Sequence, residues 1–122
     1  MYVERELNRL LELPLGWDGR HAARTTYEAV QTTVDVLPAI SDEQSIPPQF
    51  FPLPDGGIQV EWHVAGAAIE IEIDGAGEAY AVALNADKKI LFEQEVGAEE
   101  VKGLSVLRGL VGNLSARASG TG

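Results

Sequence analysis

Residues 58–73 read IQVEWHVAGAAIEIEI, and this stretch decides the fold. Apolar and polar residues alternate on both sides of Ala65-Gly66, which is typical of β-strands that bury only one face. A two-residue loop at Ala65-Gly66 predicts an antiparallel hairpin with Trp62 opposite Ile69. This register gathers the apolar side chains on one face, whereas a slip of one residue would scatter them. The stretch therefore predicts a hairpin with one buried face and one wet face.

A further strand is expected to follow this hairpin. Residues 74–77 read DGAG and close the next turn. Taken as a four-residue loop, they predict that Tyr80 lies opposite Ile71 and Val82 opposite Ile69. The chain would then continue as a meander.

Two more strands are expected at the ends of the meander. Residues 90–95 predict a strand with Ile90 and Phe92 facing inward. Upstream, the run 50–53 contains Pro52, which has no N–H to donate to a neighbouring strand. This run is therefore expected either to lie at an edge of the sheet or to be irregular.

Helical spacing of apolar residues predicts three helices. The first covers residues 1–13 and ends before Pro14. Thr25 and Glu28 have the spacing of a capping box, so a second helix is expected to begin there. Residues 97–114 predict a last helix with acidic residues at its N-terminal end. The expected fold class is α+β: two N-terminal helices, a four- to five-stranded antiparallel meander, and a C-terminal helix packed on one sheet face.

Length and composition indicate one globular domain. With 122 residues, of which 45% are hydrophobic, the chain can bury a core; we expect a single domain over 1–114 and a flexible tail over 115–122. The absence of cysteine excludes disulfides and thiolate chemistry. Charged residues interrupt the N-terminal apolar residues, and no run approaches the roughly 20 apolar residues of a membrane span. We expect a soluble, cytoplasmic protein.

The charge balance indicates which partners are favoured. Nineteen acidic and 9 basic residues give a formal net charge of −10. Such a field repels phosphate backbones and anionic lipids, so direct nucleic-acid or membrane binding is disfavoured. The expected partner is another protein with a basic surface. The alternative is that the charge only keeps the domain in solution.

The outward face of the first hairpin is the candidate site. Its register puts Glu61 opposite Glu70, and like charges in such positions destabilise a sheet. A basic partner or a cation would relieve this repulsion, whereas water and salt would screen it if the face is only solvated. The residues expected to bind a partner on this face are Gln59, Glu61, His63, Glu70 and Glu72.

The loop Gly16-Trp17-Asp18-Gly19 adds two candidate partner-binding residues. Trp17 either plugs a sheet edge or offers an aromatic anchor to a partner. Asp18 is expected to cap the turn and belongs to the same predicted binding set.

Signatures of catalysis are missing from the chain. The serines lie in no nucleophile-elbow motif, and there is no phosphate loop or dinucleotide fingerprint. We therefore predict no catalytic residue, no metal and no cofactor, and a non-catalytic protein–protein interaction module. The alternative is a small hydrolase or metal-dependent enzyme using Glu61, His63 and Glu70, whose side chains could supply metal ligands.

The chain also resembles a known family. The loop 16–19 (GWDG), residues 54–63 (PDGGIQVEWH) and residues 69–73 (IEIEI) are similar to motifs of small bacterial proteins that have no settled activity. The resemblance spans roughly residues 10–73. It implies a bacterial or phage-borne cytosolic protein among accessory or mobile genes. It supplies no catalytic residues. Independently of the resemblance, the acidic surface suggests an interaction module such as an antitoxin, an immunity protein, an inhibitor or a small subunit of a larger complex.

Overall fold

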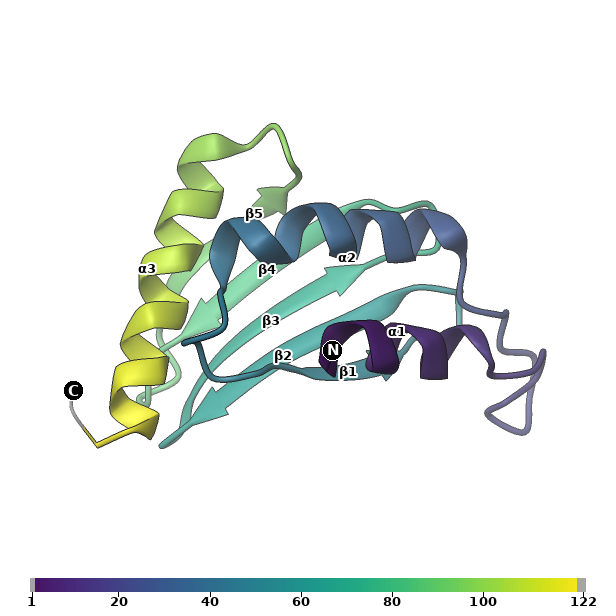
Figure 1. The fold of residues 1–122 in the computed structure, drawn as a ribbon, viewed down its shortest axis with the longest axis horizontal. Helices are drawn as coiled ribbons and strands as arrows, with labels where there is room; N and C mark the ends of the chain where they lie inside the picture. Colours follow the sequence, from purple (N-terminus) through teal and green to yellow (C-terminus); the bar gives the residue numbers. More distant parts are fainter. Residues whose placement is uncertain (1, 121–122) are drawn as a thin grey trace.

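The computed structural model describes residues 2–120. Within them the elements run α1 (Tyr2–Leu11), α2 (Tyr27–Ile40), β1 (Gln49–Pro52), β2 (Ile58–Val64), β3 (Ala67–Ile73), β4 (Ala79–Leu84), β5 (Ile90–Val96) and α3 (Val101–Ala118). The strands form one antiparallel sheet in the order β1-β2-β3-β4-β5. The helices cover one face of this sheet, with α3 crossing near one end (Figure 1). The predicted α+β class is confirmed, with all five strands in the meander.

The β2–β3 hairpin has the predicted register. Trp62 pairs with Ile69, and Glu61 pairs with Glu70. Ala65 and Gly66 form the loop with φ of 50° and 87°, the left-handed pair that a tight hairpin turn requires. The alternation of side chains therefore determined this part of the sheet.

The β3–β4 connection is one residue shorter than predicted. The Asp74 N–H donates to the Glu78 carbonyl and the Gly77 N–H donates to the Asp74 carbonyl, both at 2.9 Å. Gly77 has φ of +90°, a conformation that glycine adopts without steric cost. The loop is thus residues 75–77 rather than 74–77, and an odd loop length reverses the parity of β4.

This change of parity turns Tyr80 and Val82 to the face opposite the core. Val82 pairs with Glu70, and Tyr80 pairs with Glu72. The predicted pairs Tyr80–Ile71 and Val82–Ile69 are therefore wrong. Three small, buried side chains of β4 face the core instead: Ala79, Ala81 and Ala83.

A bulge alters the start of β5. Leu84 pairs with Ile90 and Ala83 pairs with Phe92, so Leu91 is an extra residue on β5. Phe92 faces the helices as predicted. Ile90 does not: the bulge moves it to the other face, where it is 59% exposed. Alternation alone could not predict this, because a bulge breaks the period of two.

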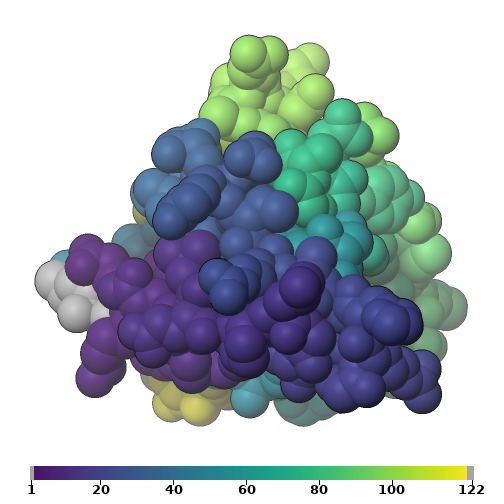
Figure 2. Space-filling view, turned by 90° about the vertical axis from the view of Figure 1, so that its right-hand side faces the viewer, coloured from purple at the N-terminus to yellow at the C-terminus, as the bar shows by residue number. Residues whose placement is uncertain are grey.

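Thr26, rather than Thr25, caps α2. The Thr26 hydroxyl accepts from the Ala29 N–H at 3.0 Å and donates to the Gly75 carbonyl at 2.8 Å. The predicted capping box of Thr25 and Glu28 is therefore wrong. The Gly75 contact joins the start of α2 to the β3–β4 hairpin. In Figure 2 these two segments lie together, above α1 and the loop that follows α1.

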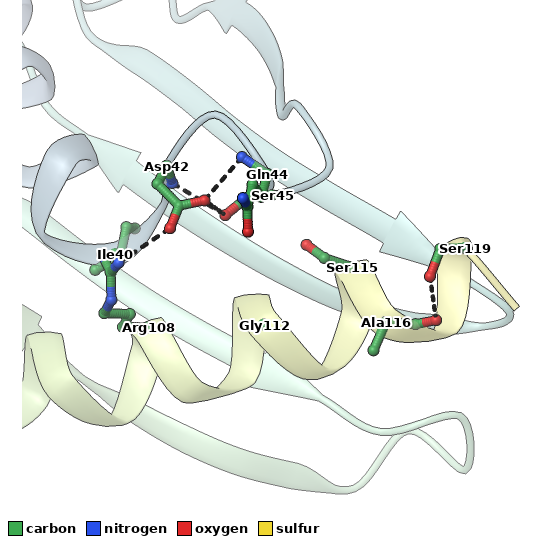
Figure 3. A pocket seen from close by; sticks show the side chains of 9 residues that line it. All are labelled: Ile40, Asp42, Gln44, Ser45, Arg108, Gly112, Ser115, Ala116 and Ser119. Carbon is green, nitrogen blue, oxygen red and sulfur yellow. Dashed lines mark hydrogen bonds and ion pairs between the residues drawn. The ribbon is translucent and has the colours of Figure 1, made fainter. Parts of the chain in front are cut away.

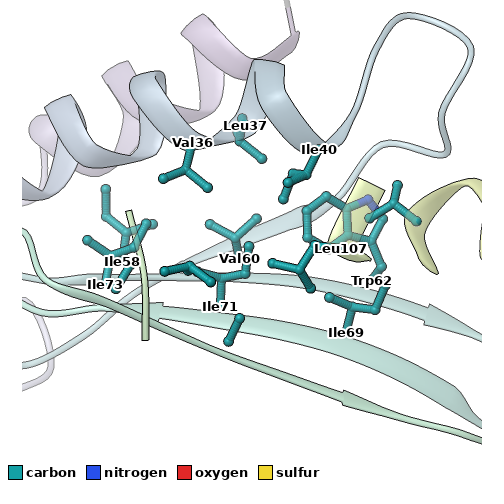
Figure 4. Close-up of a cluster of buried hydrophobic side chains, with 14 of the residues drawn as sticks. Val36, Leu37, Ile40, Ile58, Val60, Trp62, Ile69, Ile71, Ile73 and Leu107 are labelled. Atoms are coloured by element: carbon teal, nitrogen blue, oxygen red, sulfur yellow. The ribbon is translucent and has the colours of Figure 1, made fainter. Parts of the chain in front are cut away.

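The core lies between the helices and the sheet. In Figure 4, Val36, Leu37 and Ile40 of α2 face the apolar side chains of β2 and β3. Trp62 is 1% exposed, and its indole N–H donates to the Ile46 carbonyl at 3.0 Å. Its inward orientation, predicted from parity, is confirmed.

The C-terminal helix extends further than predicted. α3 continues past Leu114 to Ala118, and the Ser115 hydroxyl accepts from the Ile46 N–H at 2.8 Å. Residues 121–122 of the predicted tail lie outside the described residues. Among residues 2–120, no helix combines the length and apolar character needed to cross a membrane.

Candidate functional site

The face of the sheet opposite the helices, here called the open face, carries the candidate site. Strand pairing arranges its side chains in three rows across the sheet. The first row is Phe51, Gln59, Glu72, Tyr80 and Glu95. The second row is Gln49, Glu61, Glu70, Val82 and Glu93. The third row is His63, Ala68, Leu84 and Ile90.

Charge is segregated on the open face. The described strands contain five acidic residues, and all of them point to this face: Glu61, Glu70, Glu72, Glu93 and Glu95. None of the 9 lysines and arginines lies in a described strand. His63 is the one residue of the three rows that can carry a positive charge. Within the described strands, the face is therefore an acidic surface on which only His63 can offset the negative charge.

Glu61, His63 and Glu70 converge near the middle of this face. His63 Nε2 lies 2.7 Å from Glu61 Oε1, and one ligand atom from each of the three residues lies within 4.8 Å of the others. Gln59 Nε2 donates to Glu70 Oε1 at 3.4 Å. An imidazole and two carboxylates can bind first-row divalent metals, so these three side chains could hold such an ion.

Tyr80 joins the acidic surface through Glu93. The hydrogen bond between the Tyr80 hydroxyl and the Glu93 side chain raises the pKa of Tyr80, and partial loss of hydration and the nearby carboxylates raise it further. The neutral phenol is thus favoured in the folded protein. Tyr80 adds a hydrogen-bonding group to the face at neutral pH.

A hollow of about 560 Å³ continues the open face at the end of the sheet. It lies between the β3–β4 hairpin and the segment that joins β5 to α3. Tyr80 and six carboxylates line it, whereas no lysine or arginine does. The carboxylates are those of Glu72, Asp74, Glu78, Glu95, Glu99 and Glu100. The acidic character therefore extends beyond the strands.

The structure brings together five of the seven predicted partner-binding residues: Gln59, Glu61, His63, Glu70 and Glu72 share the open face. The other two lie in the loop after α1. The Trp17 indole N–H donates to the Ala23 carbonyl at 3.2 Å. Asp18 Oδ1 accepts from the N–H groups of Arg20 and Ala22, which confirms its role as a turn cap. These bonds give both residues a local structural role, and their part in binding stays a prediction.

Sequence reasoning assigned three residues of the face to the core and left Glu93 and Glu95 out of the binding set. Tyr80 and Val82 were assigned to the core because the β3–β4 loop was taken to be one residue too long. Ile90 was assigned inward because the bulge was not recognised. The alternation of Glu93 and Glu95 was a usable signal, since both flank the inward-facing Gln94.

A second hollow, of about 340 Å³, separates the loop after α2 from α3 (Figure 3). Asp42 Oδ2 forms an ion pair with Arg108 at 3.1 Å across it. The N–H of Gln44 donates to Asp42 Oδ1 at 2.9 Å and is the main cause that lowers the pKa of Asp42. These contacts hold the loop against α3, so the polar lining has a structural explanation.

Comparison of the chain with protein-family models, with curated proteins and with solved structures finds no match.

Proposed function

We propose that the chain is a non-catalytic protein-binding module whose open face binds a basic surface of another protein. An antitoxin, an immunity protein, an inhibitor or a small subunit of a larger complex would be a module of this kind. The observation that carries the proposal is the charge segregation: every acidic residue of the described strands points to the one face that no helix covers.

Electrostatics supports a basic partner. Glu61 and Glu70 oppose each other directly, and such pairs destabilise a sheet. Lysine or arginine side chains of a partner would replace this repulsion with attraction. A surface of one sign also steers an oppositely charged partner and speeds association at low salt. The same field disfavours nucleic acid and anionic membranes.

The test is affinity capture from a bacterial lysate by two matched variants. In the face variant, Glu61, Glu70 and Glu72 become glutamine. In the control variant, the exposed glutamates Glu4, Glu12 and Glu43, which lie outside the strands, become glutamine. Both variants lose the same charge, so only the position of the charge differs.

We expect the wild type and the control variant to retain the same basic protein, with retention falling as salt increases. We expect the face variant to lose it. Equal retention by both variants would reject the open face as the binding surface.

A metal-dependent enzyme is the second candidate, because the ligand atoms of Glu61, His63 and Glu70 converge within 4.8 Å. This candidate predicts stoichiometric divalent metal in freshly purified protein, and loss of that metal in His63→Ala. Elemental analysis that finds no metal in protein purified without chelators would reject it.

A further inference from the structure

The two edges of the sheet differ in how well they are covered. β1 is short, contains Pro52, and has α1 beside it: Arg9 donates to the Phe50 carbonyl at 3.2 Å. β5 spans Ile90–Val96 and ends the sheet on the other side. Within residues 2–120, the backbone of β5 makes only the hydrogen bonds of strand pairing. Its outer N–H and C=O groups are therefore available to another strand.

Helix α3 presents apolar side chains along this edge. Gly103 lies against Gln94 and Phe92, since a Cβ there would meet the Gln94 amide first and would be 3.5 Å from the Phe92 ring. Leu110 shares a hollow with Leu91. Val106 follows Gly103 by three residues and precedes Leu110 by four, so it lies on the same side of the helix. Val106 is 49% exposed and Leu91 is 54% exposed. A strand added to β5 would find apolar contacts with Val106 and Leu91 for its inward side chains, beside the Gln94 amide.

The opposite side of the same edge is acidic. Glu93 and Glu95 point to the open face, and the hollow lined by Glu95, Glu99 and Glu100 lies at the end of β5. Antiparallel pairing of two copies about Gln94 would put Glu93 of one copy opposite Glu95 of the other, which is unfavourable. In that register a second copy of this chain is disfavoured, whereas a strand with outward basic side chains matches the acidic side of the edge.

We propose that β5 accepts an extended segment of the partner protein as a sixth strand. The segment alternates lysine or arginine, which face Glu93 and Glu95, with apolar residues, which pack beside Val106. Main-chain hydrogen bonds supply affinity in such strand addition, and the alternate side chains supply specificity. This inference rests on the proposed function, because it specifies how a basic partner is bound.

The test uses two synthetic peptides of identical composition and charge, acetyl-KVKVKVK-amide and acetyl-KKKKVVV-amide. Only the first can place its lysines on one side of a strand and its valines on the other. Backbone amide shifts and amide hydrogen exchange of the wild-type chain are followed during titration. We expect the alternating peptide to bind about tenfold more tightly than the block peptide, and to slow exchange of amides in residues 90–96.

Two variants locate the binding. Glu93→Lys/Glu95→Lys reverses charge on exposed positions and should weaken binding of the alternating peptide by about tenfold or more. Val106→Asp, on α3, should also weaken binding of the alternating peptide, because it removes an apolar contact while the sequence of β5 is unchanged. Thermal melting checks that each variant is folded. Equal affinity for the two peptides, protection outside β5, or dimerisation of the wild type through β5 would overturn the inference.

Failure of this inference is distinct from failure of the proposed function. If the peptides do not select β5 but the Glu61/Glu70/Glu72 variant still loses a captured basic protein, only the sixth strand is rejected. If that variant also retains the protein, the open face itself is rejected.

Discussion

Glu61 on β2 and Glu70 on β3 lie directly opposite each other on the open face. Each has one neighbour that offsets part of the repulsion: His63 Nε2 is 2.7 Å from Glu61, and Gln59 Nε2 is 3.4 Å from Glu70. No lysine or arginine of the described strands does so. The pair is therefore a local cost to stability that a basic ligand would remove.

Removing one charge of this pair should stabilise the isolated domain. We expect Glu70→Gln to raise the free energy of unfolding by about 0.2–1 kcal/mol, because glutamine removes the charge and still accepts from Gln59. The gain should shrink at high salt. Urea titrations measure it, with Glu43→Gln, in a loop, as the control for net charge. A loss of stability, or an equal gain in the control, would contradict the prediction.

The raised pKa of Tyr80 has a predictable origin and sign. Because the neutral phenol is favoured, its contribution to stability is present below the ordinary tyrosine pKa and is lost as the pH rises through the raised pKa. We expect Glu93→Gln to move the pKa of Tyr80 toward its ordinary value. Tyrosinate absorbance in a Tyr2→Phe/Tyr27→Phe background reports on Tyr80 alone.

Glu43→Gln serves as the control for the tyrosine titration, since Glu43 is not among the groups that shift the pKa of Tyr80. An unchanged titration in Glu93→Gln would show that the Tyr80–Glu93 hydrogen bond does not form in solution.

Two glycines should respond oppositely to alanine. At Gly77, φ is +90° and a Cβ would lie 2.9 Å from the Glu28 carbonyl oxygen, so Gly77→Ala should lower the free energy of unfolding by about 1–3 kcal/mol. At Gly109, inside α3, a Cβ meets nothing within 4 Å, and Gly109→Ala should raise it by about 0.5–1 kcal/mol. Chemical denaturation measures both. Equal changes would refute the turn geometry.

The two tryptophans should differ in their contribution to stability. Trp62 is 1% exposed and holds the Ile46 carbonyl, so Trp62→Ala should cost about 3–5 kcal/mol. Trp17 is only half-buried, and Trp17→Ala should cost less. Urea titrations followed by circular dichroism compare them. A larger loss for Trp17→Ala would place the core elsewhere.

The candidate site was predictable where one strand or one tight hairpin decides it. Gln59, Glu61 and His63 alternate on β2, so their common face follows from the pleat of a strand. Ala65-Gly66 admits a two-residue turn, which sets Glu70 opposite Glu61. The edge position of β1 followed equally from Pro52, which cannot donate to a neighbour.

The remainder of the face depended on choices that local pattern leaves open. The run DGAG permits a three- or a four-residue loop, and Ala79, Ala81 and Ala83 are too small to force a register by hydrophobicity. The tertiary structure decides the loop length, because Gly77 packs against Glu28 in the first turn of α2. The Gly77 carbonyl also accepts a hydrogen bond from the Thr32 hydroxyl, further along that helix. The bulge before Phe92 likewise has no signal in the alternation of residues.

The sequence by itself determined the two-sided β2–β3 hairpin, the acidic composition and the class of fold, because side chains alternate strictly along a strand. Only the tertiary structure decided that the helices cover the same face of the sheet and that β5 stays open at its edge. Turn length and helix placement depend on packing between segments that are distant in the sequence. A periodic pattern within one strand carries no information about that packing.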